Sequence, residues 1–371
     1  MKKNNPTQND LYNKISQLIS ESRKHVAQSI NYTMLFTNFY IGKYIIEDEQ
    51  QGADRAEYAK KTLTNLSKKL TKKFGKGFSK RNLELMRKFY FMYSNQISAS
   101  TLRKLIITQT TSANSETPSR KSQKTQTLSA KSSTLSRISK FPLKLSWSHY
   151  VLLLKIDNEN ERNFYEIEAA ENNWSVRELQ RQYNSSLYER VALSKNKTKV
   201  KELGKKGQIV IEPVDILKDP YVLEFLNLKE ETVYTESQLE QAIIDRIEKF
   251  LLELGKGFLF DSRQKRISFD GDNFYIDLVF YNRLLKCFVL IDLKIGKLMH
   301  QDIGQMQMYV NYFDREIKEK DENKTVGIIL CKETNKTVVE FTLPEENDQI
   351  YAREYKLYLP SKKELQKLLK D

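Results

Sequence analysis

The spacing of apolar residues changes along this chain, and the change limits the folds that it can adopt. From about residue 11 to residue 93, apolar residues recur every three or four positions, as Leu66, Leu70 and Phe74 do. That spacing predicts amphipathic helices. In the last third of the chain it is replaced by short runs of apolar, aromatic and β-branched residues, which are typical of strands. The chain is therefore predicted to be α+β, with an all-helical part followed by an α/β part.

The length and a polar segment predict how these parts are divided. A chain of 371 residues exceeds the usual size of one hydrophobic core, so we expect two domains. We place a helical domain at 1–200, a connector at 201–230 and an α/β domain at 231–371. Between about 97 and 141, Ser, Thr, Gln and Lys replace the apolar pattern, which predicts a flexible insert in the helical domain. This basic insert could touch phosphate backbones or serve only as a solvated tether.

The charge balance points to an anionic partner. Lys and Arg outnumber Asp and Glu by 62 to 48, which gives a formal net charge of +14. Nucleic acid is the leading candidate, because each phosphate that contacts Lys or Arg releases bound counterions. The alternative is a charge excess that only keeps the protein soluble.

A short segment of the helical part, FGKGFSKRNLELMRKFY, predicts a helix, a turn and a second helix. Gly75 and Gly77 can end the first helix, and Ser79 can cap the start of the next. Such a pair is either a helix-turn-helix that reads nucleic acid or a plain helical hairpin with a solvated charged face. If it binds nucleic acid, the side chains available to phosphates are Lys80, Arg81 and Arg87.

The sequence predicts a cytoplasmic protein with no membrane partner. Its first residues, MKKNNPTQND, lack the apolar core of a signal peptide, and no apolar run is long enough to span a bilayer. The two cysteines, Cys287 and Cys331, lie within apolar runs, so we expect buried core residues and not a disulfide.

The α/β part is predicted to begin with a helix that carries a candidate acid. Thr235 and Gln238 form a capping-box pattern at its start, and Gly255 stands where it should stop. Glu240 lies at the flank of the buried stripe, where it can point toward a neighbouring sheet. Most glutamates in such positions are simply solvated.

Three apolar runs then follow, FLFDSRQKRISF, NFYIDLVFYN and KCFVLIDLKIG, and predict a meander of strands. Asp277 interrupts the second run, and Asp292 and Lys294 interrupt the third. A carboxylate buried and unpaired in a strand would cost several kcal/mol, so Asp277 needs a cation or an exposed strand end. Because residues two apart in a strand share a face, Asp292 and Lys294 must point the same way.

The expected turn brings these three charged side chains together. A turn near 282–285 with a loop of two or four residues returns the chain so that Asp277 lies beside Asp292. Two close carboxylates suit Mg²⁺, which commonly takes one or two carboxylates and keeps water and phosphate oxygens as its other ligands. Lys294 could orient the attacking water or stabilise negative charge. The alternative is a structural salt-bridge cluster without a metal.

This pattern resembles the PD-(D/E)xK nuclease superfamily, and the chain is most similar to its YhcG-type family. The resemblance is carried by LEQAIIDRIEKFLLELGKGF, FYIDLVFYNRLLKCFVLIDLKIGKL, DIGQMQMYVNYFD and GIILCKETNKTVVEFTL, and in the helical part by GFSKRNLELMRKFY, LSWSHY and WSVRELQRQ. It implies a restriction-endonuclease-like domain with a central mixed sheet behind a helical domain that binds nucleic acid. Two positions depart from the superfamily pattern: Ile276 replaces the usual Pro, and Asp292 stands where many relatives carry Glu.

The resemblance also implies roles for individual residues. It makes Asp277, Asp292 and Glu240 the ligands of Mg²⁺, with Mn²⁺ as a second candidate, and Lys294 the group that assists the attacking water. Gln305 and Tyr309, one helical turn apart, resemble an element that contacts nucleic acid, although helix packing explains them equally well. Arg263 could face phosphate or belong to a surface charge run.

The function expected from these residues is Mg²⁺-dependent hydrolysis of phosphodiester bonds by an endonuclease, with DNA favoured over RNA. Two alternatives remain open: a catalytically silent protein that keeps the nuclease fold and binds nucleic acid, and an adaptor whose helical domain recruits another protein. A homodimer or a protein partner is compatible with either.

Overall fold

The computed structural model describes residues 6–51, 55–97, 143–195, 197–228, 234–269 and 271–369. Apart from residue 97, the insert predicted at about 97–141 lies outside these residues. Contacts divide the chain into two compact units, Met1–Asp157 and Asn158–Asp371, and each is described by itself.

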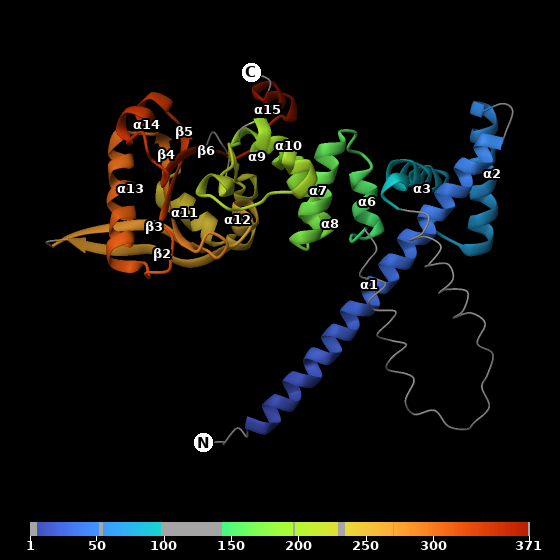
Figure 1. Ribbon diagram of the computed structural model, residues 1–371, viewed down its shortest axis with the longest axis horizontal. Helices are drawn as coiled ribbons and strands as arrows, with labels where there is room; N and C mark the ends of the chain where they lie inside the picture. The colour runs from blue at the N-terminus through green and yellow to red at the C-terminus, as the bar shows by residue number, and fades with distance from the viewer. Residues whose placement is uncertain are drawn as a thin grey trace. The chain divides into compact units, whose positions relative to one another are not determined.

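The first unit is helical, as predicted. Its helices are α1 (Pro6–Gln51), α2 (Arg55–Phe74), α3 (Lys80–Tyr93), the short η1 (Ser94–Gln96) and α6 (Trp147–Leu153) (Figure 1). The core of this unit forms where α3 lies against the C-terminal half of α1: the Phe39 ring contacts those of Phe89 and Tyr90 at centroid distances of 6.0 and 4.9 Å. The rings of Trp147 and Tyr150 of α6 also contact Phe89, at centroid distances of 5.3 and 5.1 Å.

The predicted turn between α2 and α3 is confirmed. Gly75 and Gly77 take φ values of +83° and +112°, which favour glycine, and the Ser79 hydroxyl accepts a hydrogen bond from the Asn82 amide. Basic side chains around this turn are exposed. They are Lys68, Lys69, Lys72, Lys73, Lys76, Lys80 and Arg81.

The second unit opens with helices and a connector that joins the sheet. The helices are α7 (Glu159–Glu171), α8 (Val176–Asn184), α9 (Leu187–Leu193) and α10 (Lys197–Lys206), followed by η2 (Pro213–Ile216), β1 (Tyr221–Val222) and η3 (Glu224–Leu226). β1 pairs in parallel with β6 (Ile350–Lys356), so the segment expected to be only a connector contributes an edge strand.

A mixed sheet forms the centre of this unit, as expected. Its strand order is β1-β6-β5-β4-β3-β2. The meander of β2 (Phe258–Phe269), β3 (Asp272–Asn282) and β4 (Cys287–Lys297) is antiparallel, whereas β5 (Val326–Glu333) pairs in parallel with both β4 and β6. Asn282 pairs with Cys287, so the β3–β4 loop spans residues 283–286, one of the two loop lengths that the sequence favoured.

Helices cover both faces of the sheet (Figure 1). Ile291 and Leu293 of β4 pack into one core with α11 (Glu236–Ile244) and α12 (Ile247–Leu254), while Leu290 packs into a second core with α13 (His300–Tyr312). Because successive side chains of β4 point to opposite faces of the sheet, this strand contributes to both cores. The π-helical turn η4 (Phe313–Ile317) continues α13, and α14 (Lys336–Thr342) and α15 (Lys362–Leu368) complete the unit.

One predicted helix is wrong in its continuity. The sequence predicted a single helix from Thr235 to Gly255, but the structure has α11 and α12 with a break at residues 245–246. The expected capping box at Thr235 and the stop at Gly255 are both present. No Gly or Pro at this position predicts the break. The Arg246 guanidinium donates to the Leu226 carbonyl, a tertiary contact that cannot be predicted from helical spacing.

Two further expectations concern cysteines and membranes. Cys287 and Cys331 are buried free thiols, as predicted. Among the helices in the described ranges, none is both long enough and apolar enough to cross a bilayer.

Candidate active site

The site forms where β3 and β4 stop pairing. Their paired residues run from Asn282 opposite Cys287 to Leu278 opposite Ile291. The next positions are Asp277 and Asp292. There a side chain replaces the backbone as hydrogen-bond partner: Asp277 Oδ2 accepts a hydrogen bond of 2.8 Å from the Leu293 amide. The Asp277 carboxylate is thus fixed against β4 between the positions of Asp292 and Lys294.

Asp292 and Lys294 form an ion pair at the same place. Lys294 Nζ lies 2.8 Å from Asp292 Oδ2 and 3.9 Å from Glu236 Oε2 of α11. Burial, together with the neighbouring Asp277 carboxylate, raises the pKa of Asp292 to about 7 despite the attraction of Lys294. Burial alone would lower the pKa of Lys294, but the pairing with Asp292 outweighs it and holds that pKa above its usual value. Lys294 therefore stays protonated.

Glu240 is linked to Asp277 through the side chain of Gln264. Gln264 Nε2 donates to Glu240 Oε2 at 2.6 Å and to Asp277 Oδ1 at 3.0 Å. Burial raises the pKa of Glu240, whereas hydrogen bonds from Gln264 and the charge of Arg263 act to lower it. The predicted third ligand is therefore buried beside the site but held one bridging amide away from Asp277.

Gln264 is a site residue that sequence reasoning missed. Its φ of +46° is rare for a residue with a side chain, and it lies just beyond the irregular pairing between Phe260 and Ser262. In the sequence it is one polar residue within the run DSRQKR, and no pattern in that run predicts a left-handed backbone.

Arg263 is occupied by protein groups. Its Nε lies 3.1 Å from Glu240 Oε1, and its Nη1 donates to Gln241 Oε1 at 2.9 Å. A contact between Arg263 and phosphate, as the sequence suggested, would have to share or replace these bonds. In this structure the guanidinium instead offsets the charge of Glu240.

Gln305 and Tyr309 lie on α13 beside the site. Gln305 Nε2 contacts the Tyr309 hydroxyl at 2.6 Å, and that hydroxyl donates to the Tyr275 carbonyl at 2.9 Å. Burial and the charge of Asp292 raise the pKa of Tyr309 to about 12. Since Tyr309 is buried, its visible role is to tie α13 to β3, and Gln305 is the more accessible of the two.

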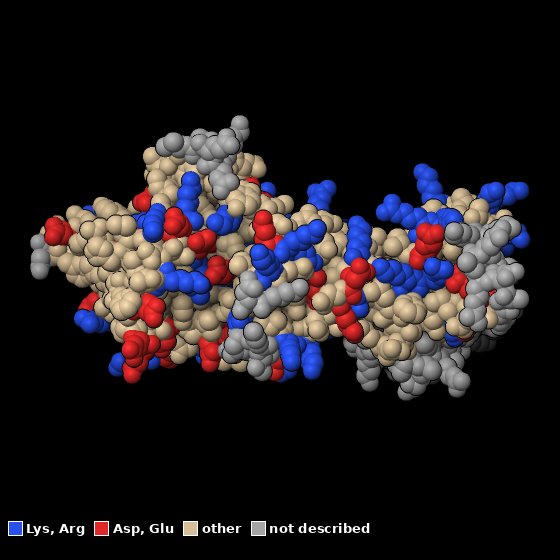
Figure 2. Space-filling model, turned by 90° about the horizontal axis from the view of Figure 1, so that it is seen from above, with Lys and Arg blue, Asp and Glu red and all other residues tan. Residues whose placement is uncertain are grey.

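The other predicted nucleic-acid contacts belong to the helical unit. Lys80 and Arg81 are exposed at the start of α3, whereas Arg87 Nη1 pairs with Glu49 Oε1 at 2.8 Å. Figure 2 shows Lys and Arg side chains gathered over this unit with few carboxylates among them. Lys80 and Arg81 are thus better placed to meet phosphates than Arg87, whose charge is partly offset.

The donor set fits an ion that keeps several waters and not an all-protein cage. Within the described residues, no group of three or more His, Cys, Asp or Glu side chains could hold a metal. Asp277 and Asp292 are a pair, which matches the one or two carboxylates that Mg²⁺ commonly uses. Asp292 Oδ2 is buried without a well-aligned hydrogen bond, although Lys294 lies close to it. A cation there would stabilise the charged Asp292 carboxylate against burial and against the repulsion of Asp277, the two causes that raise its pKa.

Comparison with known proteins adds independent findings. Residues 214–370 match the family model described as YhcG PDDEXK nuclease domain, and residues 14–190 match the DUF1016 N-terminal domain. The chain is 39% identical over 359 residues to the Escherichia coli (strain K12) protein named "Putative nuclease YhcG", covering 96% of this chain and 92% of that protein.

Two solved structures also match part of the chain. A repair endonuclease from Pyrococcus abyssi shares 18% identity over 36% of this chain and 50% of its own, with a TM-score of 0.24. The structure titled EndoMS-dsDNA2 complex shares 16% identity over 36% of this chain and 50% of its own, with a TM-score of 0.25.

Proposed function

The chain belongs to the YhcG family of proteins with a PDDEXK nuclease domain, and from this premise we propose that it is a metal-dependent endonuclease acting on DNA. The observation that supports this most strongly is the meeting of Asp277 with the Asp292–Lys294 pair where β3 and β4 part. It brings two carboxylates and one ammonium group together at the point where the two strands stop pairing, and the Asp277 side chain is partly exposed there.

Asp277 and Asp292 would hold the divalent ion. Such an ion, when bound, neutralises charge on the phosphoryl group and acidifies a water molecule. Asp277 is fixed for this role by the Leu293 amide and Gln264, so its carboxylate needs little reordering. Glu240 accepts a hydrogen bond from Gln264 and pairs with Arg263, so it orients the Gln264 side chain that joins it to Asp277. Glu240 is also the candidate third ligand.

Lys294 would supply a fixed positive charge. Its ammonium group is half-buried and stays protonated, so it can donate hydrogen bonds to the attacking water or to a phosphate oxygen. Because it keeps its proton, we assign it orientation and charge stabilisation, not the removal of a proton from water.

The helical unit would hold the substrate by its phosphates. The exposed lysines and Arg81 around the α2–α3 turn offer positive charge without base-specific contacts, so binding through them should weaken steeply as salt rises.

The test of the proposed function is cleavage of labelled nucleic acids by the full chain. We expect products from DNA in Mg²⁺ or Mn²⁺ and none when a chelator is added, because the two carboxylates cannot activate water alone. Duplex, junction and single-stranded DNA, with matching RNA, identify the substrate. Cleavage that survives chelation, or no cleavage of any substrate in either metal, contradicts the proposal.

One observation favours a second function, that of a silent nucleic-acid-binding protein. The Asp292–Lys294 ion pair partly neutralises the site by itself, as a structural salt bridge would. Under that alternative, DNA binding is retained in every metal condition and no product appears.

A further inference from the structure

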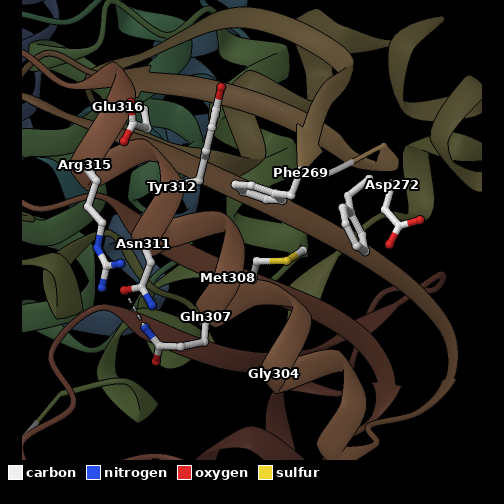
Figure 3. Close-up of a pocket in the computed structure, with 10 residues that line it drawn as sticks. Phe269, Asp272, Gly304, Gln307, Met308, Asn311, Tyr312, Arg315 and Glu316 are labelled. Carbon is white, nitrogen blue, oxygen red and sulfur yellow. Dashed lines mark hydrogen bonds between the residues drawn. The ribbon is translucent and has the colours of Figure 1, made fainter.

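An open pocket of about 690 Å³ lies between the β2–β3 hairpin and α13 of the second unit. The site described above does not use it. Figure 3 shows the Phe269 and Tyr312 side chains next to each other, with Met308 below them and the Gln307 and Asn311 side chains to the left.

Aromatic side chains form one end of the pocket. The Phe269 ring meets the Tyr312 ring edge-on at a centroid distance of 5.4 Å and the Phe274 ring at 6.2 Å. Phe269 is nevertheless 37% exposed, so ring surface remains open to solvent at the pocket mouth. Exposed aromatic faces of this kind are the platforms on which unpaired bases stack.

Two amides line the other end. Gln307 Nε2 donates to Asn311 Oδ1 at 3.2 Å, which leaves Gln307 Oε1 and Asn311 Nδ2 without a partner among the described residues. If both amides were flipped, one carbonyl oxygen and one amino group would still be left over. The pocket therefore presents one acceptor and one donor close together, and the edge of a nucleobase offers the complementary pair.

The pocket lies close to the candidate active site along the same strands. Phe274 is three residues from Asp277 on β3, a separation of about 10 Å for an extended strand. In the pairing of β2 with β3, Lys265 lies opposite Ile276, Ile267 opposite Phe274 and Phe269 opposite Asp272. Residues two apart in a strand share a face, so the exposed Lys265 lies on the same face of β2 as Phe269, which lines the pocket. Along the strand, Lys265 lies between Phe269 and Gln264.

The charges at the rim suit a base better than a phosphate. Asp272 and Glu316 line the pocket and would repel a phosphate placed inside it. Arg315, exposed and without a partner among the described residues, lies at the rim with Glu316, and Lys265 lies toward the active site. Phosphates of a bound strand can thus pass over the basic side chains while a base enters between the rings and the amides.

We propose that this pocket receives one unpaired base of the DNA on which the nuclease site acts, within one or two nucleotides of the bond that is cut. The inference rests on the proposed function, because it takes DNA as the ligand. It implies that the protein prefers DNA in which a base is free to leave the stack, such as a single strand, a bulge or a mismatch, since unstacking then costs least.

The test measures binding of the full chain to DNA in a chelator, so that no cleavage is required. The probes are two duplexes of equal length, one fully paired and one with a single unpaired 2-aminopurine, whose fluorescence falls when it stacks on an aromatic ring. We expect tighter binding of the bulged duplex by about tenfold and quenching of its fluorescence.

Tyr312→Leu and Phe269→Leu keep apolar bulk in the pocket but remove the rings, so we expect both to abolish the preference and the quenching. Gln307→Leu should weaken the preference while leaving the rings in place. Phe341→Ala removes an aromatic residue that is 84% exposed on α14 and serves as the matched control, with behaviour like the wild type.

The outcomes separate the two proposals. Equal binding of both duplexes by the wild-type protein, or a preference that survives Tyr312→Leu and Phe269→Leu, overturns the base pocket even if the protein cleaves DNA. Preference and quenching that depend on both rings support the pocket even if no cleavage is found. Thermal melting of each variant, followed by circular dichroism, shows whether a lost preference reflects unfolding. If the ring variants are unfolded, Gln307→Leu decides: a weakened preference for the bulged duplex supports the pocket, and an unchanged preference overturns it.

Discussion

Lys294→Met is expected to lower the rate of DNA cleavage by about 10²–10³-fold while leaving DNA affinity nearly unchanged. The substitution keeps the length of the side chain but removes the charge that lies 2.8 Å from Asp292 Oδ2. Without it, negative charge that develops on the phosphoryl group loses a fixed positive neighbour. Single-turnover cleavage and DNA binding in a chelator measure the two effects separately.

The control for this prediction lies on the same strand. Lys297 is more exposed than Lys294 and pairs with Glu333 at 3.7 Å, outside the candidate site, so Lys297→Met should cleave at nearly the wild-type rate. Lys294→Arg should remain slow, because a planar guanidinium does not reproduce the geometry of an ammonium group. Full activity in Lys294→Met would remove this residue from the proposed mechanism.

The largest effect on stability is expected at Glu253 of α12, a residue outside the candidate site. Its carboxylate is fully buried and accepts hydrogen bonds from Arg190 at 2.5 Å, Arg181 at 3.2 Å and the Val222 amide at 2.9 Å. It thereby joins α8, α9 and β1. Glu253→Gln leaves buried cations uncompensated, so we expect a loss of about 3–5 kcal/mol in the free energy of unfolding.

The pH dependence of stability provides a second measurement of the same group. Burial alone would raise the pKa of Glu253, but Arg190, Lys218 and Arg181 outweigh it and lower the pKa to about 2. A lowered carboxylate pKa stabilises the folded state above the ordinary pKa, and the contribution is lost as pH falls toward 2. The free energies of unfolding of the wild type and Glu253→Gln, measured with urea, should therefore converge at low pH.

Glu248→Gln is the matched control, because Glu248 lies on the same helix but is exposed. We expect its unfolding midpoint to stay close to that of the wild type. If Glu253→Gln unfolds at the same urea concentration as this control, the buried network does not stabilise the unit as described.

The geometry of the candidate site followed from local rules that hold across a hairpin. Alternation along β4 put Asp292 and Lys294 on one face, and a loop of 283–286 returned Asp277 to the level of Asp292. Both inferences need only the two-residue period of a strand and the length of a turn. The roles assigned to these residues, in contrast, remain predictions.

What the sequence did not reveal depends on contacts between distant segments. The left-handed backbone of Gln264, the break between α11 and α12 and the pairing of β1 with β6 are tertiary effects. The extent of the helical domain also stays a prediction. Contacts group residues 158–200 with the sheet, whereas the two family models cover 14–190 and 214–370.

The most direct test of the central claim is the binding of Mn²⁺, whose free ion is visible by electron paramagnetic resonance. We expect the wild-type protein to take up the ion, and Asp277→Asn and Asp292→Asn each to lose most of this uptake while both variants still melt cooperatively. Uptake that is the same in the wild type and both variants would contradict the claim that these two carboxylates hold the metal.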